Sequence, residues 1–283
     1  MSHAKTPTVS SASPAVAEGL LAEARGLTIP SRFSGPPDSG NGGYVSGRIA
    51  AYLDGPVTVT LRRPVPLETA LAVERGDGES VRVLHDGTLI AEATSSPGLA
   101  VLKVPDPVSL AEARTAAGGA RYFQDSFFPD CFVCGISRRL GDGLRIFPGH
   151  VPGRALWAAP WTPNPSVAGP DGKVRPEVVW AALDCPGGIA VAEEAGLNQD
   201  TAVVLGRMTA SLAELPAVGD PCVLIAWAGG GDGRKLTAGS ALLGLGGGVL
   251  AVAWAVWLTV PRPVPALCGE GPRGEEQRGG GAS

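Results

Sequence analysis

The sequence predicts an α+β fold made of two tandem halves, each a helix followed by an antiparallel sheet, that join into one continuous sheet. The chain has 283 residues, of which 44% are apolar and 18% charged, so it can form a large core. The same order of predicted elements occurs twice along the chain. Because a helix with a few strands cannot bury both faces of its own sheet, two such units are expected to share a core.

In the first half, the predicted helix spans residues 41–53 and predicted strands follow it. Apolar and β-branched runs separated by Gly, Pro and Asp are typical of an antiparallel meander. Turns are predicted at Gly76-Asp77-Gly78 and Asp86-Gly87. The predicted strands comprise residues 57–63, 70–74, 80–85 and 88–95.

The second half begins with a predicted helix from Pro176 onward and repeats that order. Gly231-Asp232-Gly233 falls between its second and third strands, as Gly76-Asp77-Gly78 does in the first half. One shared tripeptide is weak in a chain with 41 glycines, so the prediction depends on the order of elements. The predicted strands comprise residues 203–212, 222–227, 235–244 and 249–260.

These patterns divide the chain into five segments. The Ser-, Ala- and Thr-rich start and the Gly-, Glu- and Arg-rich end are expected to be disordered, and a connector with a short Ala-rich helix is expected between the halves. The segments are 1–18 (disordered), 19–104 (first half), 105–125 (connector), 126–262 (second half) and 263–283 (disordered tail).

The stretch Ala238–Val260 has the length of a membrane-spanning helix, and its only polar side chains are Ser240 and Thr259. However, Gly246-Gly247-Gly248 interrupts it in the middle, and no cluster of Lys and Arg flanks it. Val, Trp and Thr after these glycines favour strand over helix. We therefore predict a strand hairpin here and no association with a membrane.

Charge and cysteine content restrict the class of partner and the compartment. The net charge is −4 without a long basic run, which argues against a nucleic-acid surface. The first eighteen residues lack the apolar core of a secretory signal. Five cysteines, an odd number, fit a reducing compartment better than a disulfide scaffold. We expect a cytoplasmic protein with a small-molecule ligand.

Three stretches resemble one known family. Gly40-Asn41-Gly42-Gly43-Tyr44, followed by an apolar helix, resembles the start of the central helix of hotdog-fold thioesterases. Residues 176–188 (Pro-Glu-Val-Val-Trp-Ala-Ala-Leu-Asp-Cys-Pro-Gly-Gly) resemble the same helix in the second half, and residues 131–148 resemble a stretch of acyl-CoA thioesterase-like proteins of actinobacterial type. The resemblance spans about residues 30–260 and implies a double hotdog, but no motif is diagnostic of a substrate.

In family members of the phenylacetyl-CoA thioesterase type, a His-Gly-Gly sequence precedes an acidic residue seven positions after the second glycine. Their glycine amides stabilise the thioester oxyanion, and the acid acts as base or nucleophile. The first half here keeps Asn41-Gly42-Gly43 but has Ala50 at the acidic position. The second half has Asp184, but Pro176-Glu177 replaces the glycines. The resemblance therefore implies one composite site, in which antiparallel helices bring Gly43 to Asp184.

The chemistry of thioester hydrolysis calls for such a combination. Backbone N–H groups at a helix N-terminus stabilise the negative charge on the carbonyl oxygen, and a carboxylate activates water or attacks the acyl carbon. Each residue also has a structural alternative. Asp184 can be a helix residue before Pro186, a proline expected to end or kink the helix. Asn41-Gly42-Gly43 can be a turn with a helix cap.

Four further residues are candidates for substrate binding. Arg62, Arg63 and Arg138 suit the phosphates of coenzyme A because a guanidinium binds phosphate through two hydrogen bonds. Glu177 shares a helix face with Asp184 and is a candidate partner for it. The alternative is that these four charged side chains are simply exposed to solvent on a strand, a loop or a helix and bind no ligand.

The cysteines predict no metal site. Cys131 and Cys134 have metal-like spacing, but a zinc site needs about four ligands, and no second pair exists. Completion by Cys185 or His150 remains an alternative to two buried thiols in a tight turn. No Cys–His pair for nucleophilic catalysis, Gly-x-Ser-x-Gly motif or phosphate-binding loop is indicated.

The function implied by the resemblance is acyl-CoA thioester hydrolysis at the composite site, with coenzyme A as part of the substrate and no separate cofactor. In this site Asn41 and the amides of Gly42 and Gly43 would bind the thioester oxygen, and Asp184 would serve as base or nucleophile. The alternative from another class is a ligand-binding or assembly protein that kept the fold and lost turnover. A hotdog hydratase ranks last, because no histidine lies near either helix in sequence. A homo-oligomer is expected, since exposed sheet edges can pair further.

Overall fold

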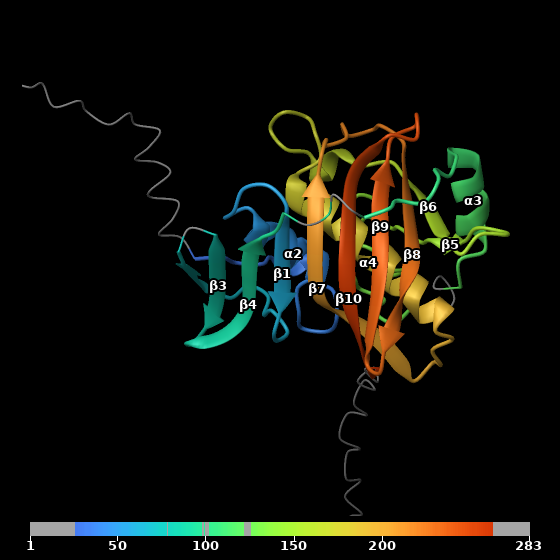
Figure 1. Ribbon diagram of the computed structural model, residues 1–283. Helices are drawn as coiled ribbons and strands as arrows, with labels where there is room; N and C mark the ends of the chain where they lie inside the picture. The colour runs from blue at the N-terminus through green and yellow to red at the C-terminus, as the bar shows by residue number, and fades with distance from the viewer. Residues whose placement is uncertain (1–25, 78, 98, 100–101, 122–125, 263–283) are drawn as a thin grey trace, which may run out of the picture.

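A computed structural model describes residues 26–77, 79–97, 99, 102–121 and 126–262. The expectations of disorder for 1–18 and 263–283 lie outside these residues. One antiparallel sheet dominates the structure, with its strands in the order β2-β3-β4-β1-β7-β10-β9-β8-β6-β5 (Figure 1). The strands are β1 Val57–Leu61, β2 Ala72–Arg75, β3 Ser80–His85, β4 Thr88–Ser95, β5 Gly149–His150, β6 Trp157–Trp161, β7 Thr201–Leu212, β8 Cys222–Asp232, β9 Lys235–Leu243 and β10 Val249–Pro261.

The predicted repeat is present in the sheet. Strands β1-β4-β3-β2 of the first half and β7-β10-β9-β8 of the second half lie in the same order relative to the helix that precedes each set. The halves join where β1 pairs with β7, with Val57 opposite Ala210 and Val59 opposite Met208. The fold is thus the predicted α+β double hotdog with one continuous sheet.

The stretch 238–260 forms parts of β9 and β10, as the interrupting glycines indicated. Along β10 the buried and less buried side chains alternate, so one face of the strand packs on the core. Among the residues that the structure describes, no helix is long and apolar enough to cross a membrane.

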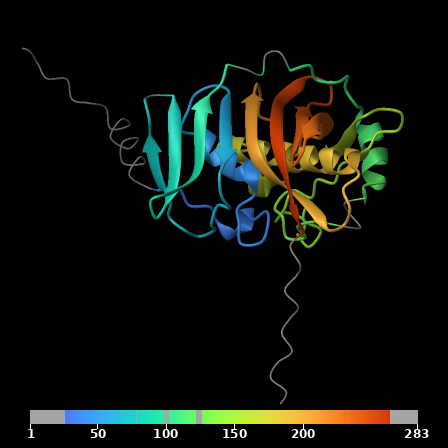
Figure 2. The same cartoon turned by 60° about the horizontal axis from the view of Figure 1, so that its bottom comes forward.

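Two helices cover one face of the sheet, and each comes directly before the first strand of a repeated set, β1 or β7. They are α2 Gly42–Ala50 and α4 Pro176–Glu194, and Figure 2 shows α4 running across the strands. Short 3-10 turns at Ser31–Phe33 and Pro165–Val167 lie upstream of each. The main core lies between these helices and the sheet. It contains buried side chains from both halves, which therefore share one core.

The helices α2 and α4 run antiparallel and touch backbone to backbone. A Cβ atom on Gly43 would lie 2.6 Å from the Trp180 carbonyl oxygen, and one on Gly47 would lie 2.6 Å from the Glu177 Cα. Later residues of α2 therefore contact earlier residues of α4, as expected for antiparallel helices. Glycine permits this approach, because any larger residue would push the helices apart.

Of the two expectations for Pro186, a helix end or a kink, the helix end is wrong, since α4 continues through it to Glu194. Residues on both sides of Pro186 are buried, including Leu183 and Ile189. This tertiary burial outweighs the one backbone hydrogen bond that proline removes. The Ser240 hydroxyl donates to the Leu183 carbonyl at 2.7 Å and so tethers the helix to β9 at this position.

The segment between the halves contains α3, Leu110–Gly118, which begins with a capping box formed by Ser109 and Glu112. Its buried Ala113 and Ala116 pack in a second apolar cluster with Val223 and other residues. Successive residues of a strand face opposite sides, and the neighbouring Cys222 and Leu224 belong to the main core. Helix α3 therefore covers the opposite face of the sheet from α4.

Candidate active site

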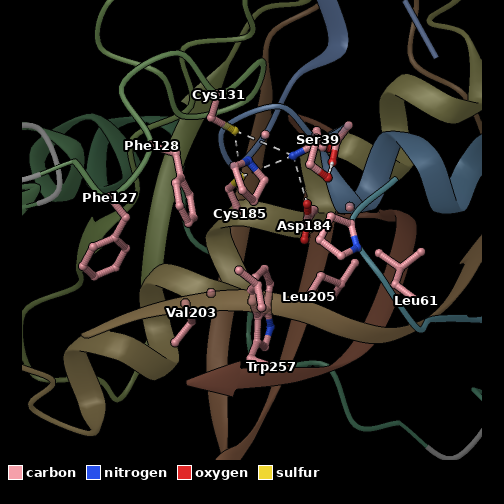
Figure 3. Close-up of a pocket in the computed structure, with 18 of the residues that line it drawn as sticks. Ser39, Leu61, Phe127, Phe128, Cys131, Asp184, Cys185, Val203, Leu205 and Trp257 are labelled. Atoms are coloured by element: carbon pink, nitrogen blue, oxygen red, sulfur yellow. Dashed lines mark hydrogen bonds between the residues drawn. The ribbon is translucent and has the colours of Figure 1, made fainter. Parts of the chain in front are cut away.

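Asp184 lies in the middle of α4 with only 3% of its surface exposed. Its Oδ2 accepts a hydrogen bond from the Gly43 backbone N–H at 2.8 Å and another from the Asn41 Nδ2 at 3.0 Å. Figure 3 shows Asp184 in the wall of a pocket beside Cys131 and Cys185. Its Oδ1 is buried and has no hydrogen-bond partner among the described residues. The carboxylate is therefore fixed through Oδ2, while Oδ1 keeps its capacity to accept a hydrogen bond.

The start of α2 supplies both donors. Asn41 is the N-cap of this helix, and its Oδ1 accepts a hydrogen bond from the Tyr44 backbone N–H at 2.9 Å. Its Nδ2 is thereby directed to Asp184. The amides of the first helical turn have no partner within the helix, and the helix dipole favours a negative charge there. Asp184 thus lies where a helix N-terminus stabilises an anion.

Burial raises the pKa of Asp184 from 3.8 to about 7, because removal from water penalises the charged carboxylate. The hydrogen bond from Gly43 opposes this rise, the nearby Cys131 adds to it, and the hydrogen bond from Asn41 opposes it. No ion pair with Asp184 occurs in the described part of the chain. Desolvation therefore dominates the electrostatics of this carboxyl.

A pocket of about 250 Å³ opens beside Asp184 between α2, α4 and the strands β7 and β10. A β-bulge between Val256 and Trp257 brings Trp257 opposite Leu205, and both side chains line this pocket. Its other walls combine apolar side chains with a few polar groups near Asp184. The apolar side chains are Leu61, Phe127, Phe128, Ile189, Val203, Val204 and Leu258.

Gly42 lines the same pocket. Its backbone N–H lies at the first position of α2, where no acceptor exists within the helix, and no partner for it is found among the described residues. A Cβ on Gly42 would lie 2.9 Å from the Leu205 Cβ, so glycine keeps the backbone open here. The two glycine amides therefore differ, since Gly43 binds Asp184 and Gly42 remains available.

The arginine candidates lie in two different places. Arg62 and Arg63 are exposed and line the mouth of the pocket. The Arg62 Nε donates to Glu92 at 3.1 Å. The Arg63 backbone N–H donates to the Ile90 carbonyl at 3.3 Å, but its guanidinium has no ion-pair or hydrogen-bond partner within the described ranges.

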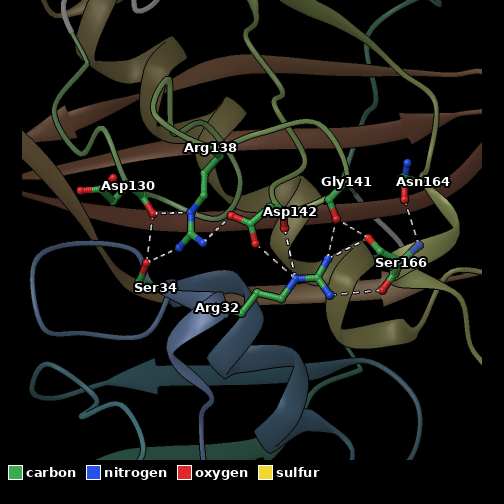
Figure 4. A network of polar contacts seen from close by, with 8 residues as sticks. All are labelled: Arg32, Ser34, Asp130, Arg138, Gly141, Asp142, Asn164 and Ser166. Carbon is green, nitrogen blue, oxygen red and sulfur yellow. Dashed lines mark hydrogen bonds and ion pairs between the residues drawn. The ribbon is translucent and has the colours of Figure 1, made fainter.

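Arg138 does not line the pocket. Its guanidinium donates to the Asp130 carbonyl at 2.9 Å, to Asp142 Oδ2 at 2.9 Å and to the Ser34 hydroxyl at 2.6 Å (Figure 4). In the same view, Arg32 donates to the carbonyls of Gly141 and Asp142. Arg138 thus has several protein partners that hold its loop together.

Glu177 also lies away from the pocket, about two helical turns before Asp184. It faces Gly47 of α2 and forms an ion pair with Arg175 at 3.8 Å. No contact between Glu177 and Asp184 occurs in the part of the chain that the structure describes. A partnership between these two acids is therefore not seen in the structure.

One group of pocket residues could not be found by sequence spacing. The Sγ atoms of Cys131, Cys134 and Cys185 lie within 4.8 Å of one another, beside Asp184. Cys185 comes from α4, 51 residues after Cys134, so neither local pattern nor motif spacing links them. No histidine lines the pocket in the described residues, and His150 lies on β5 against the Trp157 ring.

The arrangement of sheet and helices defines the double hotdog class of proteins. Among solved structures, the TesB protein of Mycobacterium avium subspecies paratuberculosis is similar with a TM-score of 0.52 at 14% identity, covering 83% of this chain and 92% of that chain. A hotdog-fold protein of unknown function from Alicyclobacillus acidocaldarius gives a TM-score of 0.54 at 13% identity, covering 83% of this chain and 92% of that chain. A putative thioesterase II from Thermobifida fusca gives a TM-score of 0.50 at 14% identity, covering 81% of this chain and 91% of that chain.

No protein-family model matches the sequence, and no curated protein shows significant similarity to it. At the low identities of the solved structures, the likeness establishes the hotdog fold of TesB-like thioesterases. What the pocket does must be inferred from its own residues.

Proposed function

We propose that this protein hydrolyses acyl thioesters of coenzyme A in the pocket beside Asp184. The observation that carries the proposal is the state of Asp184, whose carboxylate is buried and held by α2 through Oδ2 while Oδ1 is unpartnered. The thioesterase names of the TesB-like structural neighbours add support. The apolar pocket walls suit an acyl group, and the arginines at its mouth suit phosphates.

In the proposed reaction, water attacks the thioester carbonyl carbon while Asp184 Oδ1 takes one of its protons. The carbonyl oxygen gains negative charge and accepts a hydrogen bond from the Gly42 N–H. The carbon–sulfur bond then breaks, and the sulfur takes the proton from Asp184. The products are a free carboxylic acid and the coenzyme A thiol, so one water is consumed for each ester.

The roles of α2 divide between its first residues. The Gly43 N–H and the Asn41 amide orient Asp184, since both donate to Oδ2. Of the two glycine amides, that of Gly42 has no acceptor in the described part of the chain, and Gly42 lines the pocket. This division refines the expectation that both glycine amides bind the oxyanion, because Gly43 already has an acceptor.

A test of Asn41 separates its helix cap from its contact with Asp184. Asn41→Ser keeps a capping oxygen but loses the Nδ2 amide group that reaches Asp184, so we expect kcat to fall about 10- to 100-fold with little change in stability. Asn41→Ala loses both, and we expect an additional loss of about 1 kcal/mol in the free energy of unfolding. Steady-state kinetics and urea denaturation measure the two effects.

Ser109→Ala is the matched control, because it removes the N-cap of α3 on the opposite face of the sheet. It is expected to cost about 1 kcal/mol and to leave kcat unchanged. If Asn41→Ser hydrolyses substrate at the wild-type rate, the contact between Asn41 and Asp184 has no part in turnover.

Arg63 allows a test of coenzyme A recognition. Because it is exposed and unpaired at the mouth of the pocket, Arg63→Gln is expected to raise KM for acyl-CoA about two- to fivefold, the range of one exposed charge contact. The same substitution should not change KM for the corresponding N-acetylcysteamine thioester, which lacks the phosphates. Arg82→Gln is the control, since Arg82 is exposed on β3 and pairs with Glu74. Equal effects on both substrates would exclude a phosphate contact.

One observation favours a second function, the binding of an acyl thioester without turnover. The Gly43 amide and the Asn41 amide bind Asp184 in this structure, so of the three donors at the start of α2 the Gly42 amide is left for an oxyanion within the described residues. A site with one donor stabilises the transition state less than a site with two. Isothermal titration with acyl-CoAs, combined with an assay for free thiol, distinguishes binding from hydrolysis.

A further inference from the structure

We propose that Cys131, Cys134 and Cys185 form a three-thiolate site for a soft divalent cation of the zinc class, with a fourth coordination position open to the pocket. This site lies beyond the proposed hydrolysis and does not depend on it. The sequence predicted no metal, because spacing shows only the pair Cys131 and Cys134. The fold adds the third thiol from α4.

The distances between the sulfurs fit a tetrahedral metal. All three Sγ atoms lie within 4.8 Å of one another, and the Cys131 and Cys185 sulfurs are 3.7 Å apart. A zinc–sulfur bond of about 2.3 Å in tetrahedral geometry places neighbouring sulfurs about 3.8 Å apart. Only small side-chain adjustments would be needed to bring the third sulfur to that distance.

The turn that carries the first two cysteines also suits a metal. The Gly135 N–H donates to the Cys131 carbonyl at 2.9 Å, and a Cβ on Gly135 would clash with the same carbonyl oxygen. The turn is therefore tight and needs glycine at this position. Both of its cysteines are buried and point to the pocket that Cys185 also lines.

A hydrogen-bond donor from α2 lies close to two of the three sulfurs. The Asn41 Nδ2 lies 3.7 Å from the Cys131 Sγ and 3.8 Å from the Cys185 Sγ. Donors of this kind orient metal ligands and stabilise their charge.

A metal ion binds cysteine in its thiolate form, and a cation held between the three sulfurs would offset the repulsion of their charges. Soft sulfur ligands select zinc-like ions over magnesium or calcium. Three protein ligands leave one position of a tetrahedral ion free, and the cysteines line the pocket. A bound cation would also link the turn at residues 131–135 to α4, two segments that are distant in sequence.

Cobalt(II) titration tests the site, because cobalt replaces zinc in such sites and gives a sulfur-to-metal charge-transfer band. The protein is reduced, freed of metal with a chelator and studied with Cys268→Ser, since Cys268 lies outside the described residues. We expect one cobalt ion per chain with a thiolate charge-transfer band, displaced by zinc. Cys185→Ser should weaken binding at least about tenfold. Cys222→Ser is the matched control, because Cys222 is a buried thiol on β8 outside the cluster.

A second measurement needs no further substitution and so does not depend on how the Cys185 variant folds. Zinc is expected to protect Cys131, Cys134 and Cys185 from alkylation, as read by peptide mass spectrometry, and to leave the reactivity of Cys222 unchanged. The proposal is overturned if the reduced protein shows no thiolate band at micromolar cobalt. Unchanged binding in Cys185→Ser, or equal alkylation of the three cysteines with and without zinc, would overturn it as well.

Discussion

Asp184→Asn is expected to lower kcat for thioester hydrolysis by about 10²- to 10⁴-fold, the usual contribution of a general base. The amide oxygen of asparagine can accept the same hydrogen bonds from Gly43 and Asn41, so its orientation should be kept. At Oδ1, however, an NH₂ group replaces the proton acceptor. Because an uncharged amide carries no penalty for burying a charge, the variant should fold at least as well as the wild type. Free-thiol release and thermal unfolding measure the two properties.

Glu194→Gln is the control for this substitution. Glu194 is an exposed carboxylate at the end of the same helix, outside the pocket, and its replacement should change neither kcat nor stability. If Asp184→Asn retained wild-type turnover, the assigned role of Asp184 would be wrong even with hydrolysis confirmed.

Gly43→Ala is expected to have the largest effect on stability. A Cβ at this position would lie 2.5 Å from the Asp184 Cβ and 2.6 Å from the Trp180 carbonyl oxygen, and neither atom can move without shifting α4. Overpacking of this kind costs about 1–3 kcal/mol, which exceeds the gain of about 1 kcal/mol that alanine brings to a helix. Urea denaturation should show this loss, and turnover should fall as well because Asp184 is displaced.

Gly118→Ala is the matched control in another helix. No atom lies within 4 Å of a Cβ built at Gly118, so only the helix propensity changes and stability should stay level or rise slightly. Equal stability of the two alanine variants would mean that α2 and α4 are not in backbone contact at Gly43.

The fold could be predicted from the sequence because its signals are local. Apolar alternation and turn residues placed the hairpin of β9 and β10 correctly and excluded a membrane helix. The repeated order of elements predicted the two halves and their shared sheet. Pro186 misled the prediction because the intrinsic cost of a proline is visible in sequence, whereas the burial that outweighs it is not.

The candidate site was only partly predictable, because most of its contacts are tertiary and leave no local signal in the sequence. The two related helices, one with the glycines and one with the acid, implied that Gly43 and Asp184 would be adjacent, and a hydrogen bond joins them. Cys185 was only one of two possible completions of the Cys131–Cys134 pair, because its neighbours come from a turn that is unrelated to the repeat. Arg138 and Arg63 look alike in sequence, yet only Arg63 lies at the pocket.

The central claim, that this pocket hydrolyses acyl thioesters, is tested most directly by incubating the wild-type chain with a panel of short, long and aromatic acyl-CoAs. Free thiol and bound ester are followed in the same samples. We predict repeated turnover of at least one ester, with one thiol and one carboxylic acid formed for each ester lost. Tight binding of intact acyl-CoA without release of thiol would contradict the claim and would identify a ligand-binding protein.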